Sequence, residues 1–304
     1  MLESLKLNVL RWLIAPMVKF QWRGKIRRDL SVVDESMPVD GGRIGLRIYT
    51  PRGTGPFPVL HFFHGGGWVG CDLDSHDPLC RQLCVESGRL VVAFDYRLAP
   101  EHPFPIPVQD CLQSLDWMRR NVRRLGGDPE NIVLCGDSAG GNLAAVAAQQ
   151  ARVIHPGMIK GQVLIYPVTD HCETAQWESY RSCGSARHAL SHPKLIELWA
   201  LYLRNSPLWV AGSKAHDLAT PLHVADLSAL PPAMVLVAEN DLLRDEGVAY
   251  AERMQQAGTS VQLRHYPAQQ HGFVGLRPTP AHDEAVRDIT QWLAGNPHRA
   301  PRQQ

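Results

Sequence analysis

The stretch IVLCGDSAGGNLAAVAAQQAR, residues 132–152, decides the fold, because a strand pattern, a sharp turn and a helix pattern follow one another in it. The apolar run 132–135 predicts a buried strand, and the run 139–152 predicts a helix. Between them, Gly136 and Gly140 flank Ser138 in the order G-x-S-x-G. Glycine at both positions lets strand and helix approach closely, so that the turn presents the Ser138 hydroxyl at the sheet edge. This context predicts a nucleophilic serine.

Apolar runs of strand length alternate with helical patterns along most of the chain. Strands are expected at residues 43–49, 59–63, 90–94, 132–135, 162–166, 233–238 and 261–266. Helices are expected at residues 78–87, 110–125, 139–152, 193–202, 246–257 and 283–294. Continuous apolar strands that alternate with helices are typical of a mostly parallel sheet with helices on both faces. The sequence therefore predicts an α/β domain.

A second glycine-rich motif, HGGGW at residues 64–68, follows the predicted strand at 59–63. Consecutive glycines allow backbone angles that other residues cannot reach, so their N–H groups can point at one oxygen atom. Acyl transfer needs such donors where a tetrahedral oxyanion forms. We therefore expect an oxyanion hole made by the N–H groups of Gly66, Gly67 and Ala139. A phosphate-binding loop is disfavoured, because the sequence has no G-x-x-x-x-G-K-[ST] string.

The acidic partner of such a serine is expected after a late strand. In α/β domains with a G-x-S-x-G turn, the catalytic residues follow one another along the chain in the order serine, acid, histidine. Asp241 lies just beyond the predicted strand 233–238, where a carboxylate can reach an imidazole. Asp245 more readily begins the next helix, whose first turn favours acidic residues. Asp241 is therefore the expected acid.

The general base is expected after the last strand. His271 follows the strand 261–266 by a short loop and precedes Gly272. His265 lies inside that strand, and His282 lies further out, beside the last helix. We therefore expect His271 to accept the serine proton, while the acid orients the imidazole and stabilises its charged form.

Composition excludes several classes of protein. The 31 basic and 30 acidic residues among 304 give a net charge of +1, which argues against a nucleic-acid binder. Residues 1–29 nevertheless hold seven basic and two acidic groups; a place in a cap is expected, with membrane contact as the alternative. No apolar run reaches the roughly 18 residues of a membrane-spanning helix. Seven cysteines match no disulfide framework, which favours reduced thiols and a cytoplasmic location.

Two segments lie outside the strand–helix alternation. Residues 171–230 contain no strand pattern, so they are expected to be an insertion that forms a lid or pocket element. Apolar residues at helical spacing between Leu2 and Leu13 predict a helix near the N-terminus. Aromatic residues of the glycine motif and the insertion are candidates for the acyl pocket, with a place in the core as the alternative: Trp68, Trp177, Tyr180 and Trp199.

The chain resembles the hormone-sensitive-lipase-like carboxylesterases of the α/β-hydrolase superfamily over about residues 40–295. The resemblance rests on HGGGW (64–68), DLDSHD (72–77), DYRLAPEHPFP (95–105), GDSAGGN (136–142), AENDLLRDEG (238–247) and HGF (271–273), in the family's order. It implies an eight-stranded, mostly parallel sheet with a small helical cap. It also implies hydrolysis of short acyl esters by Ser138, Asp241 and His271, no cofactor or metal, and often a homodimer. One departure is Leu242, where the family usually has proline after the acid.

The expected organisation is a cap segment at residues 1–40, a catalytic domain at 41–296 and a tail at 297–304, with 171–230 contributing to the cap. Neither a metal-ligand pattern nor a dinucleotide-binding glycine motif is found in the sequence. An amidase or arylformamidase and a longer-chain lipase are alternatives on the same fold. A non-catalytic ligand-binding relative is disfavoured, because the serine and the histidine are both present.

Overall fold

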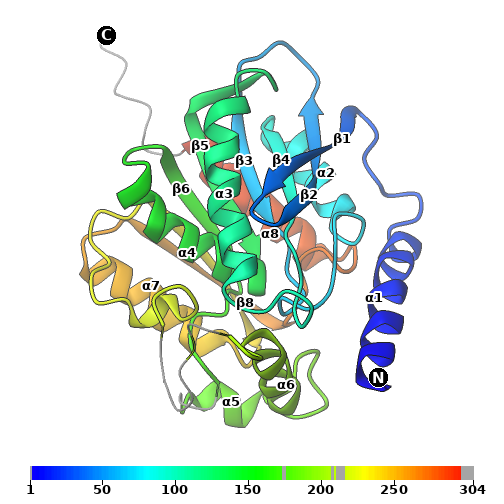
Figure 1. Cartoon of the computed structure of the whole chain (residues 1–304), viewed down its shortest axis with the longest axis vertical. Coiled ribbons are helices and arrows are strands. Elements are labelled where there is room, and N and C mark those ends of the chain that lie inside the picture. The colour runs from blue at the N-terminus through cyan, green and yellow to red at the C-terminus, as the bar shows by residue number, and fades with distance from the viewer. Residues whose placement is uncertain (1, 173–175, 207–208, 210–215, 296–304) are drawn as a thin grey trace.

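Eight strands form a single sheet through the middle of the protein, shown by the computed structural model in Figure 1. The structure describes residues 2–172, 176–206, 209 and 216–295, without the side chains of residues 2–10 and 12. The strands are β1 (Leu30–Val39), β2 (Gly42–Pro51), β3 (Phe57–Phe63), β4 (Leu90–Asp95), β5 (Gly127–Asp137), β6 (Ile159–Ile165), β7 (Ala233–Asn240) and β8 (Val261–Gln270). The helices are α1 (Leu2–Gln21), α2 (Asp77–Ser87), α3 (Ile106–Asn121), α4 (Ala139–Ile154), α5 (Glu178–Ser182), α6 (His192–Tyr202), α7 (Arg244–Gln256) and α8 (Pro280–Gly295), with a 3-10 turn η1 (Pro221–His223).

The strand order is β1-β2-β4-β3-β5-β6-β7-β8. Strand β2 pairs antiparallel with both β1 and β4, whereas every neighbouring pair from β4 to β8 is parallel. The carboxyl ends of the parallel strands therefore meet at one edge of the sheet, which is where α/β folds place their sites.

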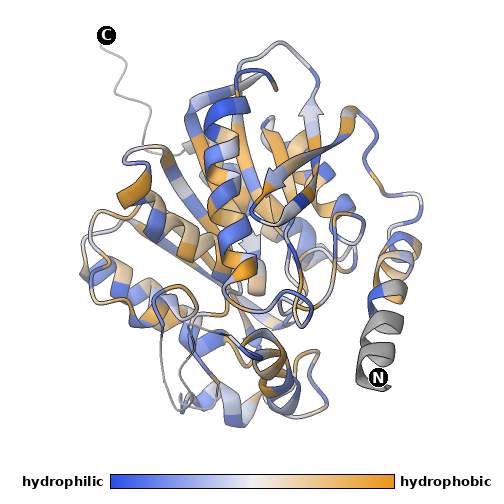
Figure 2. Ribbon diagram, in the orientation of Figure 1, coloured by the Kyte–Doolittle hydropathy of each residue, from blue (hydrophilic) through white to orange (hydrophobic). Residues whose placement is uncertain are grey.

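Helices cover both faces of the sheet, because successive side chains of a strand point to opposite sides. Val59 and Phe63 of β3 belong to a core shared with α3, α4 and α7. Leu60 and Phe62 belong to a second core shared with α2 and α8. Figure 2 shows apolar colour along the central strands and hydrophilic residues on the front of α3. Burial on both faces accounts for the uninterrupted apolar runs in the sequence.

All the predicted strands and helices are present, and the predicted fold class is confirmed. The sequence patterns miss β1. Half of the residues of this edge strand are exposed, and Asp34 and Glu35 interrupt its apolar alternation. The expected cap segment at residues 1–40 is therefore corrected, since β1 belongs to the sheet and α1 precedes it. The expected tail at 297–304 lies outside the described residues.

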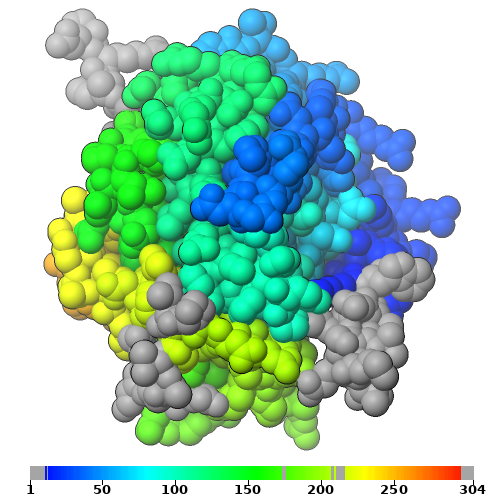
Figure 3. Space-filling model, viewed as in Figure 1, coloured from blue at the N-terminus to red at the C-terminus, as the bar shows by residue number. Residues whose placement is uncertain are grey.

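The insertion at 171–230 lies over the carboxyl edge of the sheet and contains α5, α6 and η1 in its described parts (Figure 1). Figure 3 shows it packed against the body of the domain. The Phe104 N–H, in the loop after β4, donates to the Tyr202 oxygen at 2.7 Å. In the described part of the chain, none of the helices has the length and apolar character needed to cross a membrane.

Candidate active site

Ser138 lies on the turn between β5 and α4, with φ 55° and ψ −119°. Residues with a side chain rarely adopt a positive φ, so surrounding contacts must hold this turn. The Ser138 N–H donates to the Ile165 oxygen at 2.8 Å, and the Val168 N–H donates to the Ser138 oxygen at 3.2 Å. A Cβ at Gly140 would lie 2.1 Å from the Phe63 oxygen, so the helix can approach β3 only with glycine there. The strand, the turn and the helix have the predicted arrangement.

His271 lies between Ser138 and Asp241, beyond the carboxyl ends of β5, β7 and β8. Its Nε2 is 2.9 Å from the Ser138 Oγ, and its Nδ1 is 2.7 Å from the Asp241 Oδ2. A carboxylate only accepts, so Nδ1 carries the proton and the serine hydroxyl donates to Nε2. Asp241 is buried, and its Oδ1 accepts the Leu243 N–H at 3.0 Å. The structure thus brings the three predicted residues into one hydrogen-bonded chain.

The competing acid and histidines have other partners or positions. Asp245 accepts the Ser179 N–H at 2.7 Å, in the contact between α7 and α5. His282 is buried and accepts the Gly275 N–H at 3.0 Å. His265 is exposed on β8. The geometry therefore favours Asp241 and His271 over these alternatives.

The glycine loop after β3 adopts left-handed backbone angles. Gly66 has φ 112° and Gly67 has φ 63°. A Cβ at Gly66 would lie 2.2 Å from the Gly70 oxygen, so no larger residue fits without a backbone shift. Among the described residues, no protein oxygen accepts the N–H groups of Gly66, Gly67 or Ala139. Three backbone donors therefore remain for a ligand oxygen.

The buried Asp137 carboxylate, next to Ser138, accepts a hydrogen bond from this loop and forms an ion pair with His76 at the start of α2. The Asp137 Oδ1 accepts the Gly65 N–H at 2.9 Å and lies 3.1 Å from the His76 Nε2. Burial alone would lower the pKa of His76, but the Asp137 carboxylate raises it above its usual value. Burial alone would raise the pKa of Asp137, but His76 holds it below its usual value. Both residues belong to quoted motifs, yet nothing in the spacing of those motifs indicates that they meet.

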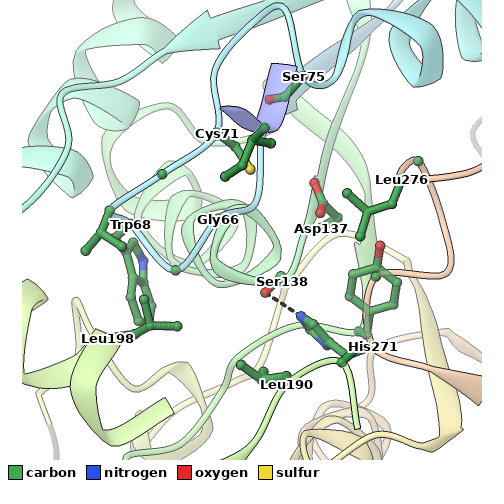
Figure 4. A pocket seen from close by; sticks show the side chains of 18 of the residues that line it. Gly66, Trp68, Cys71, Ser75, Asp137, Ser138, Leu190, Leu198, His271 and Leu276 are labelled. Atoms are coloured by element: carbon green, nitrogen blue, oxygen red, sulfur yellow. Dashed lines mark hydrogen bonds between the residues drawn. The ribbon is translucent and has the colours of Figure 1, made fainter. Parts of the chain in front are cut away.

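Ser138 and His271 open into a pocket of about 290 Å³ (Figure 4). Figure 4 shows Leu190 and Leu198 on one side of the serine and Cys71 on the other. The large aliphatic side chains of the lining are Ile14, Val69, Val168, Leu190, Leu195, Leu198, Val274 and Leu276. A pocket of this kind suits an apolar group bound next to a few polar atoms.

Helix α1 contributes directly to the pocket through Arg11 and Ile14. The Arg11 guanidinium donates to the Val69 and Ala99 oxygens, each at 2.6 Å, and pairs with Glu101 at 2.9 Å. These contacts fasten the helix to the loops around the serine. The basic N-terminal segment thus lies beside the pocket, a position that the sequence suggested but could not assign to single residues.

Of the four aromatic candidates, Trp68 alone is among the described residues that line the pocket. It is buried and stacks on Tyr202, with ring centroids 4.2 Å apart. Trp199 packs against Trp68 at 4.7 Å, and Trp177 and Tyr180 hydrogen-bond to buried carboxylates instead. The structure therefore contradicts a pocket role for Trp177, Tyr180 and Trp199, because they hold the insertion on the domain. Aliphatic residues of α6 lie in the pocket in their place.

In the part of the chain that the structure describes, no group of three or more His, Cys, Asp or Glu side chains is placed to bind a metal ion. Cys71 lines the pocket, and burial raises the pKa of its thiol to about 12. That thiol is therefore protonated at neutral pH and a poor nucleophile. Ser138, by contrast, lies in hydrogen-bond contact with the Nε2 of His271, which a buried carboxylate holds from its other side.

The sequence of residues 60–275 matches the α/β-hydrolase fold family. The chain belongs to this family. It is 40% identical over 254 residues to the carboxylic ester hydrolase LipN of Mycobacterium tuberculosis, covering 81% of this chain and 65% of LipN. It is 38% identical to esterase LipI of the same organism, covering 87% of this chain and 82% of LipI.

Solved structures agree with this assignment. A carboxylesterase from a metagenomic library, EstE1, superposes with a TM-score of 0.89 at 34% identity, over 95% of this chain and 97% of that protein. A hyperthermophilic esterase of Pyrobaculum calidifontis superposes with a TM-score of 0.87 at 34% identity, over 95% and 91% of the two chains. The resemblance to the hormone-sensitive-lipase-like carboxylesterases is thereby confirmed.

Proposed function

We propose that this protein hydrolyses short-chain acyl esters, with Ser138 as nucleophile, His271 as general base and acid, and Asp241 as the group that orients the imidazole. The observation that supports this most strongly is the continuous chain from the serine Oγ through both imidazole nitrogens to a buried carboxylate. The relatives named above are esterases, which supports the same reaction class.

In the proposed reaction, the Ser138 Oγ attacks the acyl carbon while its proton passes to the His271 Nε2. The carbonyl oxygen becomes an oxyanion, and the N–H groups of Gly66, Gly67 and Ala139 stabilise it. Collapse of this intermediate breaks the ester bond, and His271 gives its proton to the leaving alcohol. Water then attacks the acyl-enzyme and loses a proton to His271. The bond between the acyl carbon and the Ser138 Oγ breaks, the acid leaves, and His271 returns the proton to the serine.

The shape of the pocket supports a short acyl group. Its volume of about 290 Å³ lies near the lower end of the roughly 300–1,000 Å³ typical of ligand pockets. Leu198 lies against Gly67, where a Cβ would meet its Cδ1 at 2.7 Å, so α6 limits the space beside the proposed oxyanion hole. A long acyl chain would require these aliphatic residues to move.

The test is a series of p-nitrophenyl esters of increasing acyl length, with an anilide and a formamide assayed beside them. We expect the highest kcat/KM with short acyl esters, and a loss of at least about 10⁴-fold in Ser138→Ala. Ser31→Ala, an exposed residue of β1, is the matched control and should retain full activity. A maximum at long chains would indicate a lipase, faster cleavage of the amide substrates an amidase, and an active Ser138→Ala would contradict the proposed nucleophile.

A cytoplasmic location and a homodimer stay predictions from the sequence. Cell fractionation tests the first, and light scattering at several protein concentrations tests the second.

A further inference from the structure

Helix α1 has apolar side chains on two opposite faces. The inward face includes Ala15 and Val18, which are buried, and Ile14, which lines the pocket. The outward face carries three large apolar side chains at spacings of four and three residues, so they form one stripe. They are exposed to 49%, 52% and 72%: Leu13, Met17 and Phe20.

This outward stripe is the largest such group in the described part of the chain. Only four other large apolar side chains are comparably exposed there: Val33, Val153, Ile154 and Leu276. Leu276 is also a pocket residue, and so is Ile14, which adjoins Leu13 in sequence. A surface helix of a globular protein usually has a single apolar face, so a second one indicates a contact outside the chain.

Exposed cations follow the stripe directly. Arg23, Lys25 and Arg28 are exposed, and no acidic side chain among the described residues pairs with them. The neighbouring Lys19 and Arg27 differ, because they pair with Asp74 and Asp29 at 2.6 and 3.0 Å. The segment from residue 13 to residue 28 therefore combines an exposed apolar stripe with exposed positive charge that no acidic side chain among the described residues pairs.

We propose that the outward side of α1, with Leu13, Met17 and Phe20 as its apolar residues, and the segment directly after the helix, with Arg23, Lys25 and Arg28 as its cations, together bind the surface of an anionic phospholipid bilayer. The apolar side chains enter the boundary between headgroups and acyl chains, and the cations lie over the lipid phosphates. This docking goes beyond ester hydrolysis and does not depend on the proposed triad. It places the pocket beside the membrane, since Arg11 and Ile14 of the same helix line that pocket.

A second copy of the chain suits this surface less well. In a two-fold dimer the same patch would face itself, so the cations of the two copies would repel one another. Three side chains also bury far less area than the roughly 1,000 Å² that a stable dimer needs. An anionic bilayer instead complements both the charge and the apolar stripe.

The experiment is sedimentation with vesicles of phosphatidylglycerol and phosphatidylcholine, compared with vesicles of phosphatidylcholine alone. Binding is measured in the wild type and in the Ser138→Ala variant, so that failure of the proposed chemistry leaves the test intact. We expect at least about tenfold tighter binding to the anionic vesicles, weakened by added salt. The triple variant Leu13→Ser/Met17→Ser/Phe20→Ser should lose at least about tenfold in affinity while hydrolysing a water-soluble ester at the wild-type rate.

Two further variants complete the design. Val153→Ser/Ile154→Ser removes exposed apolar side chains at the end of α4 and should bind vesicles as the wild type does. Phe20→Ser alone, at the most exposed of the three positions, should still weaken binding if the triple variant unfolds. Equal binding of the wild type to both kinds of vesicle, or wild-type binding by Phe20→Ser and the triple variant, would overturn the proposal. So would a dimer that dissociates in the triple variant and does not bind vesicles.

Discussion

The carboxyl edge of the sheet and the cap, which here means α1 together with the insertion at 171–230, enclose the same pocket, but they are built differently. At the sheet edge, the positions of the reacting groups depend on backbone geometry. Ser138 and Gly66 have positive φ values, and neighbouring backbone atoms leave no space for a Cβ at Gly66. In the cap, the shape of the pocket depends on side chains instead. Leu198 limits the pocket, and Arg11 fastens α1 through its guanidinium. We therefore expect substitutions at the edge to affect the rate, and substitutions in the cap to affect which substrate enters.

The largest expected effect is at the edge. In Gly66→Ala, the new Cβ would lie 2.2 Å from the Gly70 oxygen at a φ of 112°, so the loop must shift and its N–H donors with it. We expect kcat to fall about 10²–10³-fold, as for loss of an oxyanion-hole donor. The matched control is Gly157→Ala, which has φ 76° but no atom within 4 Å of the new Cβ.

The control should retain its kcat and lose only about 1–2 kcal/mol of stability through the left-handed backbone. Steady-state kinetics and urea unfolding measure the two effects. If the two alanine variants had the same kcat, the rate would not depend on the geometry of the glycine loop, and the distinction between edge and cap would fail.

A smaller effect is expected in the cap. Leu198→Ala removes the side chain that lies against Gly67, so the pocket gains length next to the serine. We expect the optimum of the acyl-chain series to move to longer esters and the free energy of unfolding to fall by about 2–4 kcal/mol. Leu227→Ala truncates a buried leucine of the same insertion that is not among the pocket residues. It should lose similar stability with an unchanged optimum, and a shift of the optimum in both variants would contradict this view of the cap.

The smallest effect is expected at the contact between α7 of the main domain and α5 of the insertion. Glu246 is buried in α7, accepts the Thr169 N–H at 2.6 Å and hydrogen-bonds the Tyr180 hydroxyl of α5. Burial raises its pKa well above the usual value of 4.5. The folded state thus holds this proton more tightly than the unfolded state, so the free energy of unfolding should fall as the pH rises above the usual value towards the raised pKa.

Glu246→Gln cannot ionise and should flatten that part of the stability curve, gaining on the order of 1 kcal/mol relative to the wild type at the upper end of the range. Urea unfolding at a series of pH values measures it. Glu252→Gln, at an exposed position of the same helix, should keep the wild-type slope. Parallel curves for the wild type and Glu246→Gln would show that ionisation of this buried carboxyl does not contribute to the pH dependence of the free energy of unfolding.

The same contrast explains what could be predicted from the sequence. The edge is predictable because its chemistry is tied to backbone turns: the glycine pattern locates Ser138 and the loop at 64–68, and chain order locates Asp241 and His271. The cap is not, because the direction of a side chain depends on tertiary packing. Trp199 fits a pocket wall as well as a core in the sequence, and in the structure it packs behind Trp68. The sequence patterns miss strand β1 for a related reason, since half of the residues of this edge strand are exposed and acidic residues interrupt its apolar alternation.

The position of His271 beyond β8 has a consequence for how the protein is made. Strand β8 is the last in the chain and pairs with β7 at the border of the sheet, so the proposed base is the last of the three proposed catalytic residues to be made. A ribosome that has made residues 1–260 has already supplied the proposed nucleophile, acid and oxyanion donors. Because domains fold as their chain emerges, that nascent protein would still lack its proton acceptor, along with β8, α8 and the pocket residues Val274 and Leu276. The onset of hydrolysis would then mark the time at which the final strand docks. The reaction itself would therefore report when folding is complete.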